Sequence, residues 1–563
     1  MKNKLLVAMI APLCLGVVFG VTSCGQGEKI DKSKTQIYIN NFKRGFGSEW
    51  LSALKTRFEA EHAEDSYEEG KKGVQVVVHN VGTPADSRMA NILSGIDEIY
   101  FTEQSYYYSF MKYQGKNLLG DITDVVTDTL DEYGETRSIE DKLTDEQKDY
   151  YNTGSDTQKK YYALPHYSGY FGLQYDVDLF DLQGFYFAKE NLSVAEGDMG
   201  QFISKRNNVK SAGPDGIEGT TDDGLPRTYD EFFQLCDYMV SKSVIPFMSS
   251  GQNANDYLNL LVNAFAADHA GKTEYTNKFR GEGEMKDLFN CFDTNGNPVA
   301  DATPTTLTKA TGYEAYRTIG NYYGLSFLKK ILSNPNYYFD KITSNAFSAK
   351  SAQDEMLIRF TETSSKKVAM ISEGIWWENE AGTTSDELGE RFGAKYSRIN
   401  RKFGFMPFPK ATEERYQKDN TNTLFDHLFS LMFIKANVAE WKLPLVKEFV
   451  KFANSDESLR EFTRITNTPK ALSYDLTADD EKEMTYYGKT LAVLKENSDI
   501  VYPGNDSELY QLNSAFFHTD NQFSTIVKGT ENKFVWGKIR TTSAEDYFLG
   551  MYDYYKANWK NLS

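Results

Sequence analysis

The chain has few cysteines and histidines, and it lacks the short motifs that mark common catalytic sites. Its six histidines are not spaced as metal ligands, and no H-E-x-x-H, G-x-S-x-G or phosphate-binding loop is present. Carboxylates lie close together at Glu373, Glu378 and Glu380, but such closeness is expected by chance in a chain with 80 acidic residues. We therefore do not expect an enzyme, and a surface glycan-active hydrolase or adhesin remains an alternative.

Basic residues are also scarce, with 62 Lys and Arg against 80 Asp and Glu, for a net charge of -18. An acidic surface of this kind argues against nucleic-acid binding, which needs a basic footprint. Aromatic residues are plentiful, with 37 Tyr and 37 Phe, and the 563 residues exceed what one core can organise. The composition predicts a globular protein with two lobes or domains.

Long apolar runs are absent except near the first residue. There, two lysines precede an uncharged stretch that ends in V-T-S-C at Cys24. This ending is typical of bacterial lipoprotein signals, which are cleaved before a cysteine that carries diacylglycerol. A transmembrane anchor is the alternative, but the stretch contains Pro12 and is short for a span. We expect a signal peptide over residues 1–23, a lipid on Cys24 and a polar tether over residues 24–35.

Two cysteines remain once Cys14 leaves with the signal peptide and Cys24 is lipidated. Cys236 and Cys291 could pair outside the membrane, but two cysteines do not make a disulfide framework. Cys236 falls on a predicted helix that would bury it as a small apolar side chain. Two thiols are favoured, and a disulfide remains open.

The first part of the chain alternates strands and helices. Strands are expected at Gln36–Asn40, Gly73–His79 and Glu98–Thr102, with a helix capped by Ser48 between the first two. This βαβ start predicts an α/β sheet, and ligands in such sheets lie beyond the carboxyl ends of the strands. Those ends fall at residues 40–44 and 102–104; further helices are expected at 88–93 and 106–113.

Strand-like runs at Tyr161–Leu164 and Phe171–Tyr175 flank a bend, P-H-Y-S-G, where the chain is expected to leave one lobe and enter the other. A second α/β series follows, opened by the capping box T-Y-D-E at Thr228. Strands are expected at 244–248, 368–372, 403–408 and 428–434, and helices at 255–266, 313–332, 442–453, 457–465 and 544–559.

Aromatic and hydroxyl side chains gather at two places that suit a sugar. The bend carries Tyr167, Ser168 and Tyr170, and Trp376 and Trp377 stand just past the strand that ends at Gly374. Rings stack on the C–H side of a sugar while hydroxyls exchange hydrogen bonds. The alternatives are an ordinary buried strand pair and a core tryptophan pair. We expect one tryptophan in a ligand cleft and the other in packing.

The segments resemble, in order, the carbohydrate-binding group of extracellular solute-binding proteins, which are the lipid-anchored receptors of ATP-driven (ABC) importers. The resemblance covers nearly the whole chain after the signal peptide. The matching segments are the V-T-S-C ending, IYINNFKRGFGSEWLSALKTRFEAEH, EIYFTEQ followed by LLGDITDVV, YALPHYSGYFGLQYDVDLF, LPRTYDEFFQLCDYM, VIPFMSSG, KKVAMISEGIWWENE, FGFMPFPKA, and LPLVKEFVKFANSDESLREFTRITNTPKALSYDL.

This resemblance implies a periplasmic-binding-protein-like α/β fold, with two α/β lobes joined by crossing hinge strands. Lobe 1 would comprise residues 36–164 plus 423–476, and lobe 2 residues 165–422 plus 477–563. The family's ligand contacts fall at positions that correspond to Asn41, Phe42, Glu103, Gln104, Tyr167, Ser168, Ser250, Asn255, Tyr257, Trp376 and Trp377.

The resemblance also implies the partners. The protein would be a monomer on the extracellular face of the cell membrane, held by the lipid on Cys24. It would capture a sugar, more specifically an oligosaccharide, and deliver it unaltered to ABC permease subunits. A receptor for a peptide, polyamine or other small solute is the alternative.

An acidic loop, GPDGIEGTTDDGLP at residues 213–226, carries Asp215, Glu218, Asp222 and Asp223 among glycines. Such loops can surround Ca2+ with oxygens, although this one departs from the EF-hand spacing. It resembles calcium loops in some oligosaccharide receptors of the group. We expect a structural Ca2+ that pins the loop, and a solvated acidic turn without an ion is the alternative.

Overall fold

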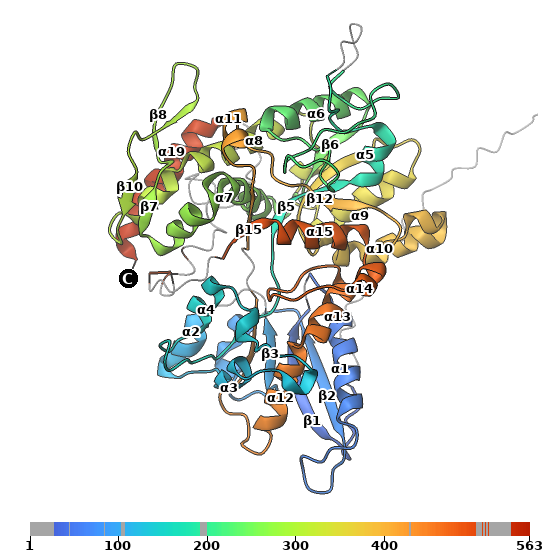
Figure 1. Cartoon of the computed structure of the whole chain (residues 1–563), viewed down its shortest axis with the longest axis vertical. Helices are drawn as coiled ribbons and strands as arrows, with labels where there is room; N and C mark the ends of the chain where they lie inside the picture. The colour runs from blue at the N-terminus through green and yellow to red at the C-terminus, as the bar shows by residue number, and fades with distance from the viewer. Residues whose placement is uncertain are drawn as a thin grey trace, which may run out of the picture.

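The computed structural model of the chain shows two lobes, one above the other (Figure 1). It describes residues 28–43, 45–83, 85–102, 107–191, 200–426, 430–502, 509, 510, 513, 516 and 542–562. The predicted signal peptide and Cys24 lie outside these residues. Among the helices of the described residues, none combines the length and the apolar character that a bilayer crossing requires.

The first lobe, the lower one in Figure 1, is built on a five-stranded sheet. Strands β1, β2 and β3 run parallel, as the βαβ start predicted, and β14 and β4 run antiparallel to their neighbours. Helix α1 buries Leu51, Leu54 and Phe58, the face predicted from their spacing. Across the sheet the order is β2 (Val74–Val81), β1 (Thr35–Phe42), β3 (Ile99–Thr102), β14 (Leu431–Ile434) and β4 (Leu164–Pro165).

Helices α12 and α13 pack on α1 although they follow it by almost 400 residues. Each of these three helices directs one apolar face inward, which is why segments so distant in sequence share one lobe. The helices drawn with this lobe are α1 (Glu49–Glu61), α2 (Tyr107–Lys112), α3 (Thr123–Thr127), α4 (Asp145–Tyr151), α12 (Leu443–Ala453) and α13 (Asp456–Thr466).

The second lobe is built on a four-stranded sheet. Its order is β12 (Phe403–Phe405), β5 (Phe171–Asp176), β11 (Val368–Gly374) and β6 (Ile245–Met248). Every residue of β5 and β11 is buried, because helices cover both faces of the sheet. The helices drawn with this lobe are α5 (Val177–Gln183), α6 (Tyr229–Ser241), α7 (Ala254–Arg280), α8 (Ile319–Ser333), α9 (Ala349–Thr361), α10 (Trp377–Phe392), α11 (Glu413–Lys418), α15 (Tyr486–Glu496) and α19 (Ala544–Asn558).

Three crossings between the lobes lie within the described part of the chain. It passes from β4 to β5 over residues 166–170, from β12 towards β14 over residues 406–426, and from α13 to α15 over residues 467–485. The predicted α/β class with two lobes and crossing strands is confirmed, while the exact lobe boundaries remain a prediction. The elements that complete the fold are β13 (Asn422–Phe425) paired with β15 (Ser498–Val501), β7 (Gly283–Met285) with β10 (Thr305–Leu307), β8 (Phe289–Phe292) with β9 (Pro298–Ala300), and α14 (Ala478–Glu483).

Several predicted elements differ in extent. The helix expected at 88–93 is a 3-10 segment at Ala85–Asn91, and the helix expected at 313–332 is divided at Thr318 into a 3-10 segment and α8. The helix expected at 255–266 continues to Arg280 across a break at Gly271, whose φ of 77° suits glycine. The capping box at Thr228 is half formed, because Glu231 accepts hydrogen bonds from Arg227 instead of closing on the cap.

Cys236 and Cys291 are both free thiols. Cys236 is buried on α6, as predicted, and burial raises the pKa of its thiol well above the usual value. Cys291 is exposed on β8.

A buried ion pair holds the segment that leaves the second lobe. The Lys410 ammonium donates to both carboxylate oxygens of Asp268 at 2.8 Å and to the Thr421 carbonyl oxygen at 2.7 Å. Asp268 also accepts the N–H of Thr423, on β13 within the second crossing segment. Because both side chains are buried, neither charge has water to replace its partner.

Lys410→Met should therefore lower the free energy of unfolding by about 3–5 kcal/mol, since it leaves the Asp268 carboxylate buried and uncompensated. Chemical denaturation measures the loss, and Lys402→Met, at an exposed position, is the control. The double variant Lys410→Met with Asp268→Leu should recover part of the stability. Equal stability of Lys410→Met and the control would contradict this role.

Candidate functional site

Trp376 stands where the two lobes meet. It directly follows the end of β11, and 8% of its surface is exposed. Its ring lies over Gly374, where an added Cβ would come within 2.2–2.4 Å of the indole. From the first lobe, Gly45 approaches so closely that an added Cβ would lie 3.2 Å from the Trp376 Cβ. The loop after β1 therefore packs on this tryptophan, and two glycines make room for it.

Trp377 has different surroundings, within the second lobe. Only 1% of its surface is exposed, and its ring meets Phe403 and Tyr487 edge-on at centroid distances of 4.8 and 5.9 Å. These contacts join α10 to β12 and α15. The structure thus places one indole at the junction of the lobes and the other in the packing of the second lobe.

Tyr257 and Glu373 lie beside the same strand end. The Tyr257 ring, on the first turn of α7, meets Phe171 of β5 at 5.1 Å. The Glu373 side chain is buried, accepts the Gly374 N–H at 2.9 Å and hydrogen-bonds with Tyr257. Burial, and then the neighbouring Glu380 carboxylate, raise the pKa of Glu373 well above its usual value. In the sequence, Glu373 was one of several neighbouring carboxylates and was not predicted as a site residue. Its position at the end of a predicted strand could have identified it.

Asn41 and Phe42 lie at the carboxyl end of β1 and are mostly buried. The Asn41 side-chain amide donates to the Asn80 Oδ1 at 2.8 Å, which fixes it against β2. Glu103 and Gln104, predicted after β3, lie outside the described residues, and so does the side chain of Asn255.

The Ser250 hydroxyl forms hydrogen bonds with Asn253 and Phe347. Its hydroxyl is within 3.1 Å of the Asn253 Oδ1, donates to the Phe347 carbonyl at 3.2 Å and accepts the Asn253 N–H at 3.0 Å. These bonds position the chain just ahead of α7.

Side chains of the first crossing point to two different spaces, one beside Trp376 and one on the opposite side of the crossing. The Tyr167 ring packs on Phe46, from the loop after β1, at 4.1 Å, on the same side as Trp376. Ser168 and Tyr170 instead line a cavity of about 370 Å³. Successive side chains of an extended segment point to opposite faces, which explains why adjacent residues serve different spaces. Of the predicted site residues, Ser168 is the one that lines this cavity.

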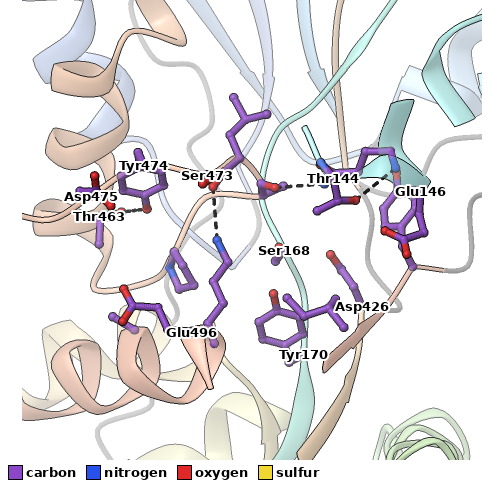
Figure 2. Close-up of a pocket in the computed structure, with 18 of the residues that line it drawn as sticks. Thr144, Glu146, Ser168, Tyr170, Asp426, Thr463, Ser473, Tyr474, Asp475 and Glu496 are labelled. Carbon is purple, nitrogen blue, oxygen red and sulfur yellow. Dashed lines mark hydrogen bonds between the residues drawn. The ribbon is translucent and has the colours of Figure 1, made fainter. Parts of the chain in front are cut away.

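Asp426, which the sequence did not single out, lines this cavity near Ser168 and Tyr170 (Figure 2). Its side chain is 2% exposed and accepts the Gly169 N–H at 2.8 Å. Burial raises the pKa of Asp426 to about 7, and the Gly169 N–H, the Ser168 hydroxyl and the Lys495 ammonium oppose this rise. A lone carboxylate between the apolar residues of T-L-F-D-H-L-F was the sequence signal that could have identified it.

The four acidic residues of the 213–226 loop are engaged mainly by the loop itself. Asp222 accepts the Asp215 N–H, Asp215 accepts the Ile217 N–H and Asp223 accepts the Gly219 N–H, while Glu218 pairs with Lys189. Burial raises the pKa of Asp222 to about 6; hydrogen bonds from the Thr220 hydroxyl and the Asp215 N–H oppose this rise, and the Asp215 charge adds to it. Within the described residues, no three His, Cys, Asp or Glu side chains are grouped as metal ligands. A cation here would need carbonyl, hydroxyl and water oxygens to complete its shell.

Comparison with solved structures identifies the fold. The chitin oligosaccharide binding protein superposes with a TM-score of 0.54 at 14% identity, over 94% of this chain and 100% of that one. RafE from Streptococcus pneumoniae gives 0.52 at 15% identity, over 94% and 99%, and has also been solved with raffinose. A probable secreted solute-binding lipoprotein from Streptomyces coelicolor gives 0.51 at 12% identity, over 93% and 99%.

No protein-family model and no curated protein matches the sequence. At the identities above, the solved structures establish the fold. The chain therefore has the two-lobe architecture of solute-binding proteins, which is the fold that the sequence resemblance implied.

The raised pKa of Asp426 predicts that the free energy of unfolding depends on pH. Its folded-state pKa of about 7 lies above the ordinary value of 3.8, so the protonated carboxyl stabilises the fold. That contribution is fully present below about pH 4 and is lost as the pH rises through 7. Asp426→Asn, which imitates the protonated form, should reduce this loss by an amount on the order of a few kcal/mol.

Urea unfolding at pH 4, 5.5 and 7.5 measures the effect, with Asp475→Asn, at an exposed carboxylate on the same cavity, as the control. An unchanged pH profile in Asp426→Asn would contradict the raised pKa.

Proposed function

We propose that this protein is a lipid-anchored receptor that captures a sugar, specifically an oligosaccharide, between its lobes. The observation that carries the proposal is the position of Trp376, on the second lobe, against the loop after β1 of the first lobe. A ring at that place is covered when the lobes meet and gains exposed surface when they part. Binding of a flat-faced ligand there would couple stacking to closure.

The neighbouring side chains suit a hydroxylated ligand. Tyr257 and the Tyr167 ring supply further aromatic surface, while Asn41 and Glu373 supply amide and carboxyl groups close to the strand ends. Ligand sites of open α/β sheets lie at such ends, and a few polar groups among rings fix the orientation of a ligand. The solved proteins with this fold support the choice of ligand, since one is named for chitin oligosaccharide and another was solved with raffinose.

Delivery to a transporter follows from the same proposal. The V-T-S-C ending would put a lipid on Cys24 and hold the receptor at the extracellular face of the membrane as a monomer. The likeness to a probable secreted solute-binding lipoprotein supports this location. The loaded receptor would then dock on ABC permease subunits and release the sugar unaltered.

Calorimetry with a panel of plant and host oligosaccharides tests the proposal, followed by mass spectrometry of the recovered ligand. Binding of an oligosaccharide that is recovered intact is expected. Recovery of shorter sugars would identify a hydrolase, and binding of peptides or polyamines alone would identify a different receptor.

Replacing Trp376 by Ala should weaken oligosaccharide binding by about tenfold or more, because a central stacking ring contributes roughly 2 kcal/mol. Trp377→Ala should instead lower the free energy of unfolding by about 3–5 kcal/mol, as expected for a deleted core aromatic. Trp441→Ala, with 52% of its surface exposed, is the control for both measurements. Unchanged affinity in Trp376→Ala would place the sugar elsewhere.

We further propose that the 213–226 loop binds Ca2+. The observation in favour is that Asp222 is buried next to the like charge of Asp215, which a cation would relieve. The hollow beside them also offers Thr220, Thr221, Asn420 and Asn422. The ion would pin the loop and take no part in sugar chemistry.

Adding Ca2+ to chelator-treated protein should raise the melting temperature, and Asp222→Asn should abolish that rise. Asp230→Asn, an exposed carboxylate on the following helix, is the control. A melting temperature indifferent to both Ca2+ and chelator would show that the loop's own hydrogen bonds suffice.

A further inference from the structure

The cavity behind the first crossing is separate from the side that carries Trp376. About 370 Å³ of space lies between the crossing segment, α4, α15 and the chain after α13. Figure 2 shows Ser168, Tyr170 and Asp426 at its centre, Glu146 on one side and Tyr474 on the other. The lining includes none of Trp376, Trp377, Tyr257 or Asn41. This space is within the range of small-molecule sites.

The lining combines ring faces, apolar surface and a few polar groups. Tyr170, Tyr474 and Tyr502 contribute rings, while Pro469, Leu472, Leu476, Ala492 and Ile500 contribute apolar surface. The Asp426 carboxylate and the Ser168 hydroxyl lie at the centre, on the crossing strands. Rings and apolar groups around a few fixed hydrogen-bonding groups suit one face of a sugar ring and its hydroxyls.

The cationic groups of the lining are already engaged. Lys272 pairs with Glu146 at 2.7 Å, and Lys495 donates to the carbonyl oxygens of Lys470 at 2.9 Å and Leu472 at 3.3 Å. An anion would therefore have to displace existing partners, and the remaining carboxylates, Asp426, Asp475 and Glu496, would repel it. A neutral hydroxylated molecule meets no such penalty.

Both lobes contribute to the cavity. Thr144, Glu146 and Gln147 belong to α4 and its cap in the first lobe, while Lys272 belongs to α7 in the second. The Glu146–Lys272 pair spans the lobes, and the floor consists of crossing segments. A molecule in this cavity would contact both lobes, so any relative movement of the lobes would change its contacts.

We propose that this cavity is a second binding site, for a single free sugar ring, on the opposite side of the first crossing from the Trp376 cleft. The proposal does not rest on the oligosaccharide function, because its evidence comes from a different set of residues. Only its consequence rests on the proposed function: with an oligosaccharide in the cleft, the protein would respond to a monosaccharide at the same time.

Calorimetric titration of the mature chain with D-glucose, D-galactose and D-xylose tests the proposal. Ala492→Phe fills the cavity from α15, and Ala478→Phe adds the same ring at an exposed position outside it. We expect at least one of the three sugars to bind the wild type and Ala478→Phe equally. Ala492→Phe should bind that sugar about tenfold more weakly or worse. Asp426→Asn keeps the shape of the cavity and, at pH 8.5, above the wild-type pKa of about 7, removes its central charge. It should also weaken binding at that pH and decides the matter if Ala492→Phe fails to fold, since equal binding by Asp426→Asn would then overturn the proposal.

Failure of all three sugars to bind would overturn the proposal, and so would equal binding by Ala492→Phe, once its melting curve shows it folded. Loss of monosaccharide binding in Trp376→Ala but not in Ala492→Phe would also overturn it, because the ring would then lie in the cleft. Loss of oligosaccharide binding in Trp376→Ala with monosaccharide binding intact is expected. If no oligosaccharide bound at all, that would count against the proposed function and leave the cavity result unaffected.

Discussion

Side chains of the first crossing point alternately to its two faces, and this alternation separates the space beside Trp376 from the cavity of Figure 2. Residues 167–170 run between two β-bridges, Tyr167 with Lys470 and Tyr170 with Asp426, and along them the side chains of Tyr167 and Ser168 face opposite ways. Tyr167 packs toward Phe46 and the Trp376 side, while Ser168 and Tyr170 face the cavity of Figure 2. The same short segment thereby links the lobes and forms part of the wall of two separate spaces.

Buried ionisable groups gather along these crossings, and their burial must be compensated by hydrogen bonds. Asp426 is held by the Gly169 N–H, and Lys495 is held by two carbonyl oxygens. His166 and Lys470 lie 2.6 Å apart, nitrogen to nitrogen, and burial lowers the pKa of both, so the neutral forms are favoured. These polar groups bond to specific partners on neighbouring crossings. These bonds tie the crossing segments to one another.

Much of the fold was predictable because its signals are local. The valine run of β2, the 3.6-residue spacing on α1 and the cap at Thr228 each specify an element from a few neighbouring residues. The helix predicted over residues 255–266 was too short, because α7 continues past the break at Gly271 to Arg280, and the division at Thr318 fell inside a helix predicted as continuous over residues 313–332. Local signals cannot show that the chain after residue 430 returns to the first sheet. That prediction came from the order of the segments, which resembles the order in solute-binding proteins.

The candidate site was less predictable, because burial depends on contacts between distant segments. Two adjacent tryptophans read alike in sequence, yet Gly45 meets one and Phe403 the other. Ser168 and Tyr167 are neighbours, yet they face different spaces. Asp426 could have been noticed as a charge in an apolar run, but its link to Gly169 joins residues 257 positions apart.

The proposed function depends on a sugar being held between the lobes against Trp376. A crystal structure of the mature protein with a bound oligosaccharide tests this most directly. We expect a sugar ring stacked on the Trp376 indole, with residues of both lobes in contact with the ligand. Density for the oligosaccharide on the outer surface of one lobe, with Trp376 still covered by Gly45, would contradict it.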